Sequence, residues 1–204
     1  MRARAPVPAA MLGLLVLGGV GCAANSVDAL TPMAADDCRP AEASRLADDY
    51  SAADLAGSWS LWLFADEGDA TGAAAGGRLD LVAWEPGEEP LVGGSPAALH
   101  GATDIDLEAV GAADSGDASS ELLERPGVLV LQWREPGAEH PSVALRLGDR
   151  SNRLDRMVID DSYTVLRVTE AADTTFAGGW ESGAGRGPVA AGRFCAVREL
   201  PSDE

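Results

Sequence analysis

The sequence predicts an all-β domain of antiparallel strands, arranged as a barrel or a sandwich, with one short helix before the first strand. Nine short segments have the composition of strands, Gly- and Pro-rich turns separate them, and little of the chain between them has helical periodicity. The helix is expected between residues 40 and 55, where Leu46 and Tyr50 are four residues apart. The candidate strands are 57–64, 78–84, 99–107, 128–133, 142–147, 155–159, 162–169, 175–180 and 192–198.

The last of these segments shows how the strands are expected to place their side chains. In 192–198, Phe194 and Ala196 fall on one face, whereas Arg193, Cys195 and Val197 fall on the other. Alternation of this kind is typical of a sheet with one buried face and one face in water.

The first 21 residues have the layout of a secretory signal. Arg2 and Arg4 precede an apolar run from Met11 to Val20, which is shorter than the roughly 20 residues that a membrane-spanning helix needs. The alternative is a buried core helix, but the chain continues as an acidic, Ala-rich segment and not as a second packed element. The sequence therefore predicts that residues 1–21 are removed during export.

The end of this segment, where Gly21 precedes Cys22, resembles the lipobox of bacterial lipoproteins, although Gly19 stands where that family usually has Leu. The resemblance implies that Cys22 becomes the lipidated N-terminus and that the partner of the chain is a membrane. Ala23 follows in place of the Asp typical of inner-membrane retention, which favours the outer membrane. Residues 22–37 would then form a lipid-anchored flexible tether at the cell envelope.

The cysteine count is consistent with this division of the chain. Of the three cysteines, Cys22 would carry lipid, so Cys38 and Cys195 remain as a pair in an oxidising compartment. We therefore expect a disulfide that closes almost the whole folded region, worth about 4–5 kcal/mol in the chain-entropy model. The alternative is two buried thiols.

The charge of the chain excludes several classes of partner and chemistry. The formal net charge is −18, with 33 acidic and 15 basic residues, and removal of the signal makes the chain more acidic still. Nucleic-acid binding needs basic patches, so we expect none. All the basic residues are arginines, which rules out a lysine Schiff base or a P-loop lysine.

Gly57 and Trp59 open the strand series with a Gly-x-Trp motif, and Arg198 closes it. This placement resembles that of lipocalins and the wider calycin group. In that family the tryptophan plugs one end of the barrel and an arginine from the last strand packs over the indole. The resemblance implies that residues 38–204 form an antiparallel lipocalin-like barrel of eight or nine strands, with Gly57, Trp59 and Arg198 as its end plug.

Catalytic and metal-binding motifs are sparse. His100 and His140 are far apart and have no zinc-ligand spacing, and no G-x-S-x-G or C-x-x-C motif occurs. A Ser-His-Asp arrangement assembled from distant segments stays an open alternative. On a strand over 99–107, Asp104 and Asp106, with Glu108 beyond, would share one face about 7 Å apart, as weak candidate ligands for Ca²⁺ or as an ordinary solvated face.

Two functions follow from these observations. The first is an envelope lipoprotein whose lipocalin-like barrel binds a small apolar ligand. The alternative is a structural or protein–protein interaction module of the envelope, without a ligand cavity, whose acidic surface engages a basic envelope protein. Neither requires a cofactor, and we expect no enzymatic activity.

Overall fold

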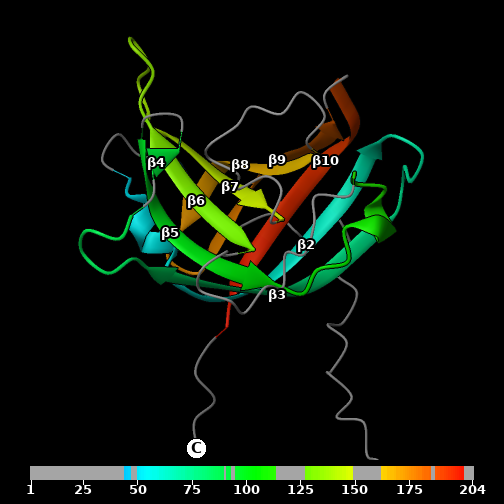
Figure 1. Cartoon of the computed structure of the whole chain (residues 1–204). Coiled ribbons are helices and arrows are strands. Elements are labelled where there is room, and N and C mark those ends of the chain that lie inside the picture. Colours follow the sequence, from blue (N-terminus) through cyan, green and yellow to red (C-terminus); the bar gives the residue numbers. More distant parts are fainter. Residues whose placement is uncertain are drawn as a thin grey trace, which may run out of the picture.

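The computed structural model describes residues 44–46, 50–89, 91–92, 95–113, 127–148, 162–184 and 187–199 (Figure 1). Within these ranges eight antiparallel strands close into a barrel, so the predicted all-β barrel is confirmed. The barrel strands are β2 (Gly57–Glu67), β3 (Ala74–Ala83), β5 (Ser95–Thr103), β6 (Val128–Trp133), β7 (Ser142–Leu147), β8 (Tyr163–Ala172), β9 (Thr175–Ala184) and β10 (Gly187–Arg198).

The barrel is an up-and-down meander. Each strand pairs with the barrel strand that follows it in the chain, and β10 also pairs with β2, which closes the ring. The register of this closing pair places Trp59 opposite Arg198 and Trp62 opposite Cys195. Figure 1 shows β10 crossing the barrel wall beside β2. The first and last strands of the ring therefore meet, and closure leaves no free sheet edge between them.

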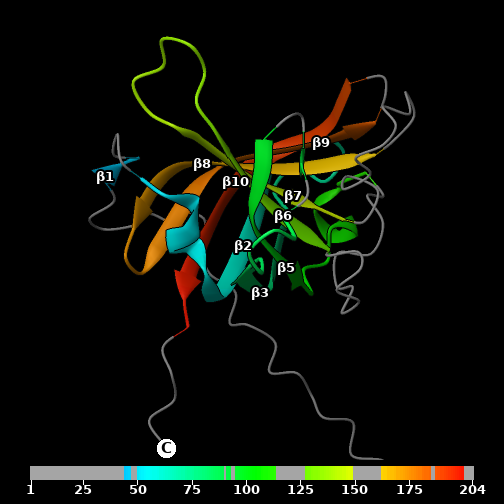
Figure 2. The same ribbon diagram turned by 60° about the vertical axis from the view of Figure 1, so that its left-hand side comes forward.

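Short elements lie outside the ring. β1 (Ser44–Arg45) pairs with the end of β8, and Figure 2 shows it beside that strand. β4 (Leu91–Val92) pairs with β5. Two 3-10 helices, η1 (Ala52–Leu55) and η2 (Glu108–Val110), complete the described elements. No helix of the described ranges has the length and hydropathy needed to cross a bilayer.

Most strands occur where the sequence predicts them, and two expectations differ from the structure. The helix expected between 40 and 55 appears within the described residues only as the four residues of η1, preceded by β1. The strand expected over 99–107 is wrong at its end, because β5 stops at Thr103 and the chain turns into η2. The candidate strand 155–159, the signal and the tether lie outside the described residues.

Side chains alternate between the two faces of the wall. One large cluster fills the interior and includes Trp59, Leu61 and Leu63 of β2, together with Phe194 and Ala196 of β10. The intervening residues form two smaller clusters on the outer face, one over β2, β9 and β10 and the other over β5 and β6. The faces predicted for 192–198 are confirmed, since Cys195 belongs to an outer cluster.

Candidate functional site

The barrel end beside η1 is closed by an arginine and a tryptophan. The guanidinium carbon of Arg198 lies 4.1 Å from the ring centroid of Trp59, within cation–π distance. Trp59 is almost fully buried, and its Nε1 donates a hydrogen bond to the Leu55 carbonyl over 2.8 Å. Trp59 and Arg198, which the sequence analysis named together with Gly57, are therefore in contact here.

Arg198 also joins three chain segments by hydrogen bonds to backbone oxygens. Its Nη1 and Nη2 donate to the carbonyls of Ala56 and Asp54, each over 2.9 Å, and its Nε donates to the Asp173 carbonyl over 3.0 Å. One side chain thus ties the end of β10 to η1 and to the β8–β9 turn. A planar guanidinium with fixed donors suits this role better than a lysine ammonium would. These hydrogen bonds hold this end of the barrel closed.

Aromatic side chains fill the barrel behind this closure. The rings of Trp59 and Phe176 are 4.8 Å apart, and those of Phe176 and Phe194 are 6.0 Å apart, both in edge-to-face geometry. Further along, the Nε1 of Trp180 donates to the Phe64 carbonyl over 3.1 Å. All four rings of this stack, Trp59, Phe176, Phe194 and Trp180, are at most 3% exposed.

Two glycines on the inner face make room for these rings. A Cβ at Gly178 would lie 3.0 Å from a Phe194 ring carbon, and one at Gly192 would lie 2.9 Å from Trp180 Nε1. Both positions would also crowd backbone oxygens of neighbouring strands. Small residues in β9 and β10 are therefore matched to large ones beside them, and side chains fill the interior at this stack of rings.

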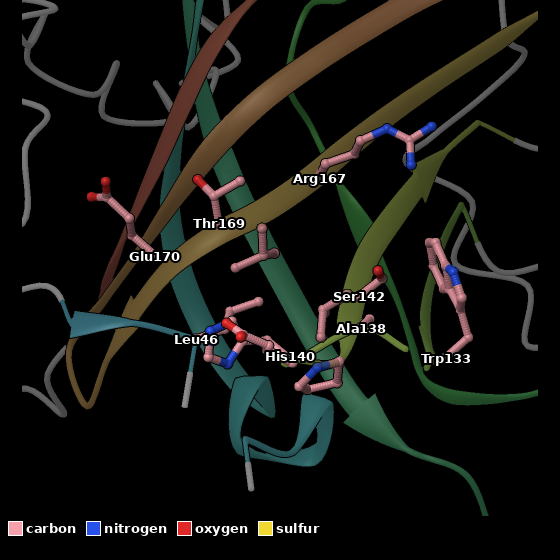
Figure 3. A pocket seen from close by; sticks show the side chains of 12 residues that line it. Leu46, Trp133, Ala138, His140, Ser142, Arg167, Thr169 and Glu170 are labelled. Carbon is pink, nitrogen blue, oxygen red and sulfur yellow. The ribbon is translucent and has the colours of Figure 1, made fainter. Parts of the chain in front are cut away.

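One concavity among the described residues opens in the barrel wall, and its lining includes Val143 and Val168 of the interior cluster. It is a groove of about 710 Å³ where β6, β7, β8 and β1 meet, lined by residues that include Leu46, Trp133, His140, Val143 and Arg167 (Figure 3). It forms because the β7–β8 pairing ends at Val143 and Val168, while β1 takes up the pairing with β8 only at Glu170. In Figure 3, Trp133 and Glu170 lie on opposite sides of the groove.

The groove has an apolar wall and a mixed-charge rim. Arg167 pairs with Glu181 over 3.3 Å at an exposed position, where such a pair contributes little to stability. Glu139 and Glu170 add negative charge around the opening. The sequence did not predict this groove, since its residues come from four separate segments and no local motif connects them.

The three carboxylates considered for a metal do not line up. Asp104 follows the end of β5 and accepts a hydrogen bond from the Arg78 amide, and Asp106 accepts one from the Ala109 amide at the start of η2. Glu108 is in η2, so the alternating strand that would have aligned all three is wrong. Within the described part of the chain, no group of three His, Cys, Asp or Glu side chains is placed to hold a metal ion.

The remaining predicted residues fall in three places. His100 is on the outer face, its ring centroid 4.1 Å from that of Trp84, and burial lowers its pKa below the usual value of 6.5. Cys195 is 2% exposed in the outer cluster with Trp62 and Phe64. Cys22 and Cys38 lie outside the described residues, so lipidation and the disulfide stay predictions.

Comparison with protein-family models and with curated protein sequences gives no match for this chain.

Proposed function

We propose that this chain is a lipid-anchored envelope protein, and that its lipocalin-like barrel is a solid scaffold that acts through its outer surface. The observation that carries the proposal is the aromatic stack inside the barrel. The ring of Phe176 packs against those of Trp59 and Phe194, and all three side chains are at most 1% exposed. A barrel of eight strands is just wide enough to be filled by side chains or to hold one small ligand. The buried ring stack supports filling by side chains.

The closed end supports the same interpretation. Arg198 and η1 close one end of the barrel with three hydrogen bonds to backbone oxygens. A ligand entering at this end would have to break these hydrogen bonds. The partner is then recognised outside the barrel. With a net charge of −18, the chain favours a basic envelope protein, and attraction of this kind weakens as salt screens it.

The test compares the natural barrel with one in which a cavity has been cut. Phe194→Ala removes a buried ring, destabilises the fold by about 3–5 kcal/mol and leaves a void that can bind a small apolar molecule. Small aromatic probes such as indole or benzene should show saturable binding to the variant by calorimetry and none to the natural protein. Stoichiometric binding of such probes to the natural protein would show an open interior and contradict the proposal.

A second candidate function rests on the groove between β6, β7, β8 and β1. Its indole and aliphatic wall, with Arg167 at the rim, fits a small amphiphile with an anionic group. Titration of the protein with a medium-chain fatty acid should then quench the fluorescence of Trp133. Replacing Trp133 with Phe should remove that signal, and replacing Trp84 with Phe should leave it unchanged. A signal that follows Trp84 would exclude the groove.

A further inference from the structure

One row of side chains crosses the outside of the barrel wall over five neighbouring strands (Figure 1). Its members are successive partners in the strand register, from β3 through β5, β6 and β7 to β8: Val82, His100, Leu129, Arg146 and Val165. Each of them stands beside a residue of the interior cluster in its own strand, so all five face outward. We call these five residues the outer row. Four strand spacings make it about 19 Å long.

The outer row is mainly apolar although it lies on the outside of the barrel. Val82 is 50% exposed, and among the described residues only one other large hydrophobic side chain is as exposed. Beside it, the ring of Trp84 stacks on His100 and packs against the outer cluster that contains Leu129. Burial lowers the pKa of His100 below 6.5, and the Glu88 carboxylate opposes this shift, so the imidazole is mainly neutral at pH 7.

Arg146 is the charged member of the outer row, and no carboxylate compensates it. The side chain is half-buried between Leu129 and Val165. Within the described part of the chain, no hydrogen bond or ion pair reaches its guanidinium, whereas Arg193 pairs with Asp66. Burial lowers the pKa of Arg146, yet an arginine keeps its charge in proteins. The charge is thus partly removed from water, and an incoming carboxylate would compensate it.

We propose that the outer row is the contact surface for the protein partner of this scaffold, and that Arg146 pairs there with a carboxylate on an apolar segment of the partner. The inference rests on the proposed scaffold function, because it names the part of the outer surface that acts. Arginine and tryptophan often carry the binding energy at the centre of a protein interface, where neighbouring contacts exclude water. Leu129 and Val165 on either side of Arg146 supply such contacts.

The extent of the outer row indicates a polypeptide as the occupant. Small ligands bind in concave sites that bury most of their surface. The outer row instead runs across the outside of five strands, about 19 Å from Val82 to Val165. A contact of this length needs a partner that presents several side chains at once.

The surrounding charges select the chemistry of that partner. Arg146 needs one carboxylate, whereas Glu88 lies near His100 and the chain as a whole carries a net charge of −18. The rest of the contact therefore favours basic side chains. A protein that is basic overall, with one carboxylate among apolar residues, meets both conditions. A membrane surface dense in phosphate groups does not, because the acidic chain is repelled by it.

The experiment places a photoreactive side chain at two equally exposed valines of the full chain. p-Benzoylphenylalanine replaces Val82 in the outer row or, as the control, Val189 of β10, which is 51% exposed and lies outside the row. Irradiation of intact cells should link residue 82 to one peptide of another protein. Mass spectrometry should find an Asp, a Glu or a C-terminal carboxylate among apolar residues in that peptide. Residue 189 should give no adduct with that protein.

Charge reversal tests the pairing with Arg146. Arg146→Glu should lower the yield of the residue-82 adduct by about tenfold or more, because two carboxylates would then face each other. Arg146→Gln, which removes the charge without reversing it, should lower the yield less. Arg193→Glu is the control at an exposed arginine of β10 and should leave the yield unchanged. Replacing the partner's carboxylate with arginine should restore the adduct of the Arg146→Glu chain, and circular dichroism checks that each variant is folded.

Other outcomes overturn the inference in distinguishable ways. A residue-82 adduct that is unaffected by Arg146→Glu and Arg146→Gln would show that no carboxylate pairs there. An adduct with a lipid, a small molecule or a second copy of this chain would show a different occupant. Salt-sensitive co-purification with a basic protein, without an adduct at residue 82, would leave the scaffold function standing and place its contact elsewhere. Neither an adduct nor co-purification would contradict both.

Discussion

Arg198 occupies the space in which a side chain at residue 57 would begin. A Cβ built on Gly57 would lie 2.7 Å from Arg198 Nη1, and the φ of Gly57 is 130°, a value that residues with a Cβ rarely adopt. The glycine and the arginine are therefore fitted to each other at the start of β2. Their contact lies where the chain enters β2, two residues before Trp59, which closes this end of the barrel.

The first prediction is that Gly57→Ala lowers the free energy of unfolding by about 2–4 kcal/mol, from backbone strain and from the contact with Arg198. Gly87→Ala is the control, since its φ is 89° but nothing lies within 4 Å of a Cβ there. It should cost only about 1–2 kcal/mol. Urea denaturation measures both values, and equal losses would show that the contact with Arg198 contributes nothing.

The second prediction concerns Arg198 itself. Arg198→Ala removes one cation–π contact and three hydrogen bonds from a charged donor, so it should destabilise the barrel by about 2–4 kcal/mol. Arg198→Lys should lose an intermediate amount, because one ammonium cannot reach all three carbonyls. Arg167→Ala, which breaks an exposed ion pair, should cost less than about 1 kcal/mol. If Arg198→Lys were as stable as the natural protein, the hydrogen bonds from Arg198 to the three carbonyls would not contribute to stability.

The third prediction is a loss of stability at high pH. Burial, helped by the nearby Asp54 carboxylate and opposed by Arg198, raises the pKa of Tyr50 from 10.0 to about 12. Between these values the folded protein keeps a proton that the unfolded chain has released. The free energy of unfolding should therefore fall as pH rises through this window, by at most about 1.4 kcal/mol per pH unit.

Tyr50→Phe tests this directly, because it removes the titrating group and keeps the ring. Denaturation curves below and above pH 10 should show a smaller alkaline loss in this variant than in the natural protein. The same comparison with Tyr163→Phe controls for loss of a tyrosine in general. An alkaline loss unchanged by Tyr50→Phe would assign it to other groups.

The fourth prediction concerns the membrane. Cys22→Ser should move the protein from the membrane fraction to the soluble envelope fraction, because two or more acyl chains are needed for stable anchoring. Cys38→Ser should leave the protein in the membrane fraction, since it changes a thiol that is not expected to carry lipid. Fractionation followed by mass spectrometry of the N-terminal peptide checks both. A Cys22→Ser protein that stays with the membrane would contradict lipid anchoring.

The strands could be predicted from sequence because their signals are local. β6 and β7 have the boundaries predicted from composition alone, and the alternation of Phe194 and Cys195 predicts their opposite faces. The end of β5 could not be predicted in this way. Ile105 and Leu107 continue the alternation beyond Thr103, but a turn stabilised by the Asp106 side chain replaces the strand. The hydrogen bond from the Ala109 amide to the Asp106 side chain competes with strand pairing there, and the alternation of apolar residues gives no sign of this competition.

By itself, the sequence determined the class of fold and the inward and outward faces of its last strand, since each of these depends on neighbours in the chain. Only the tertiary structure decided that the rings of Trp59, Phe176 and Phe194 stack inside the barrel, that a groove opens beside β8 and that Cys195 is buried with Trp62. These features depend on volumes and registers shared by strands that are distant in sequence. The rings of Phe194 and Trp180 lie against Gly178 and Gly192 of neighbouring strands, and only the pairing of β9 with β10 brings those residues together.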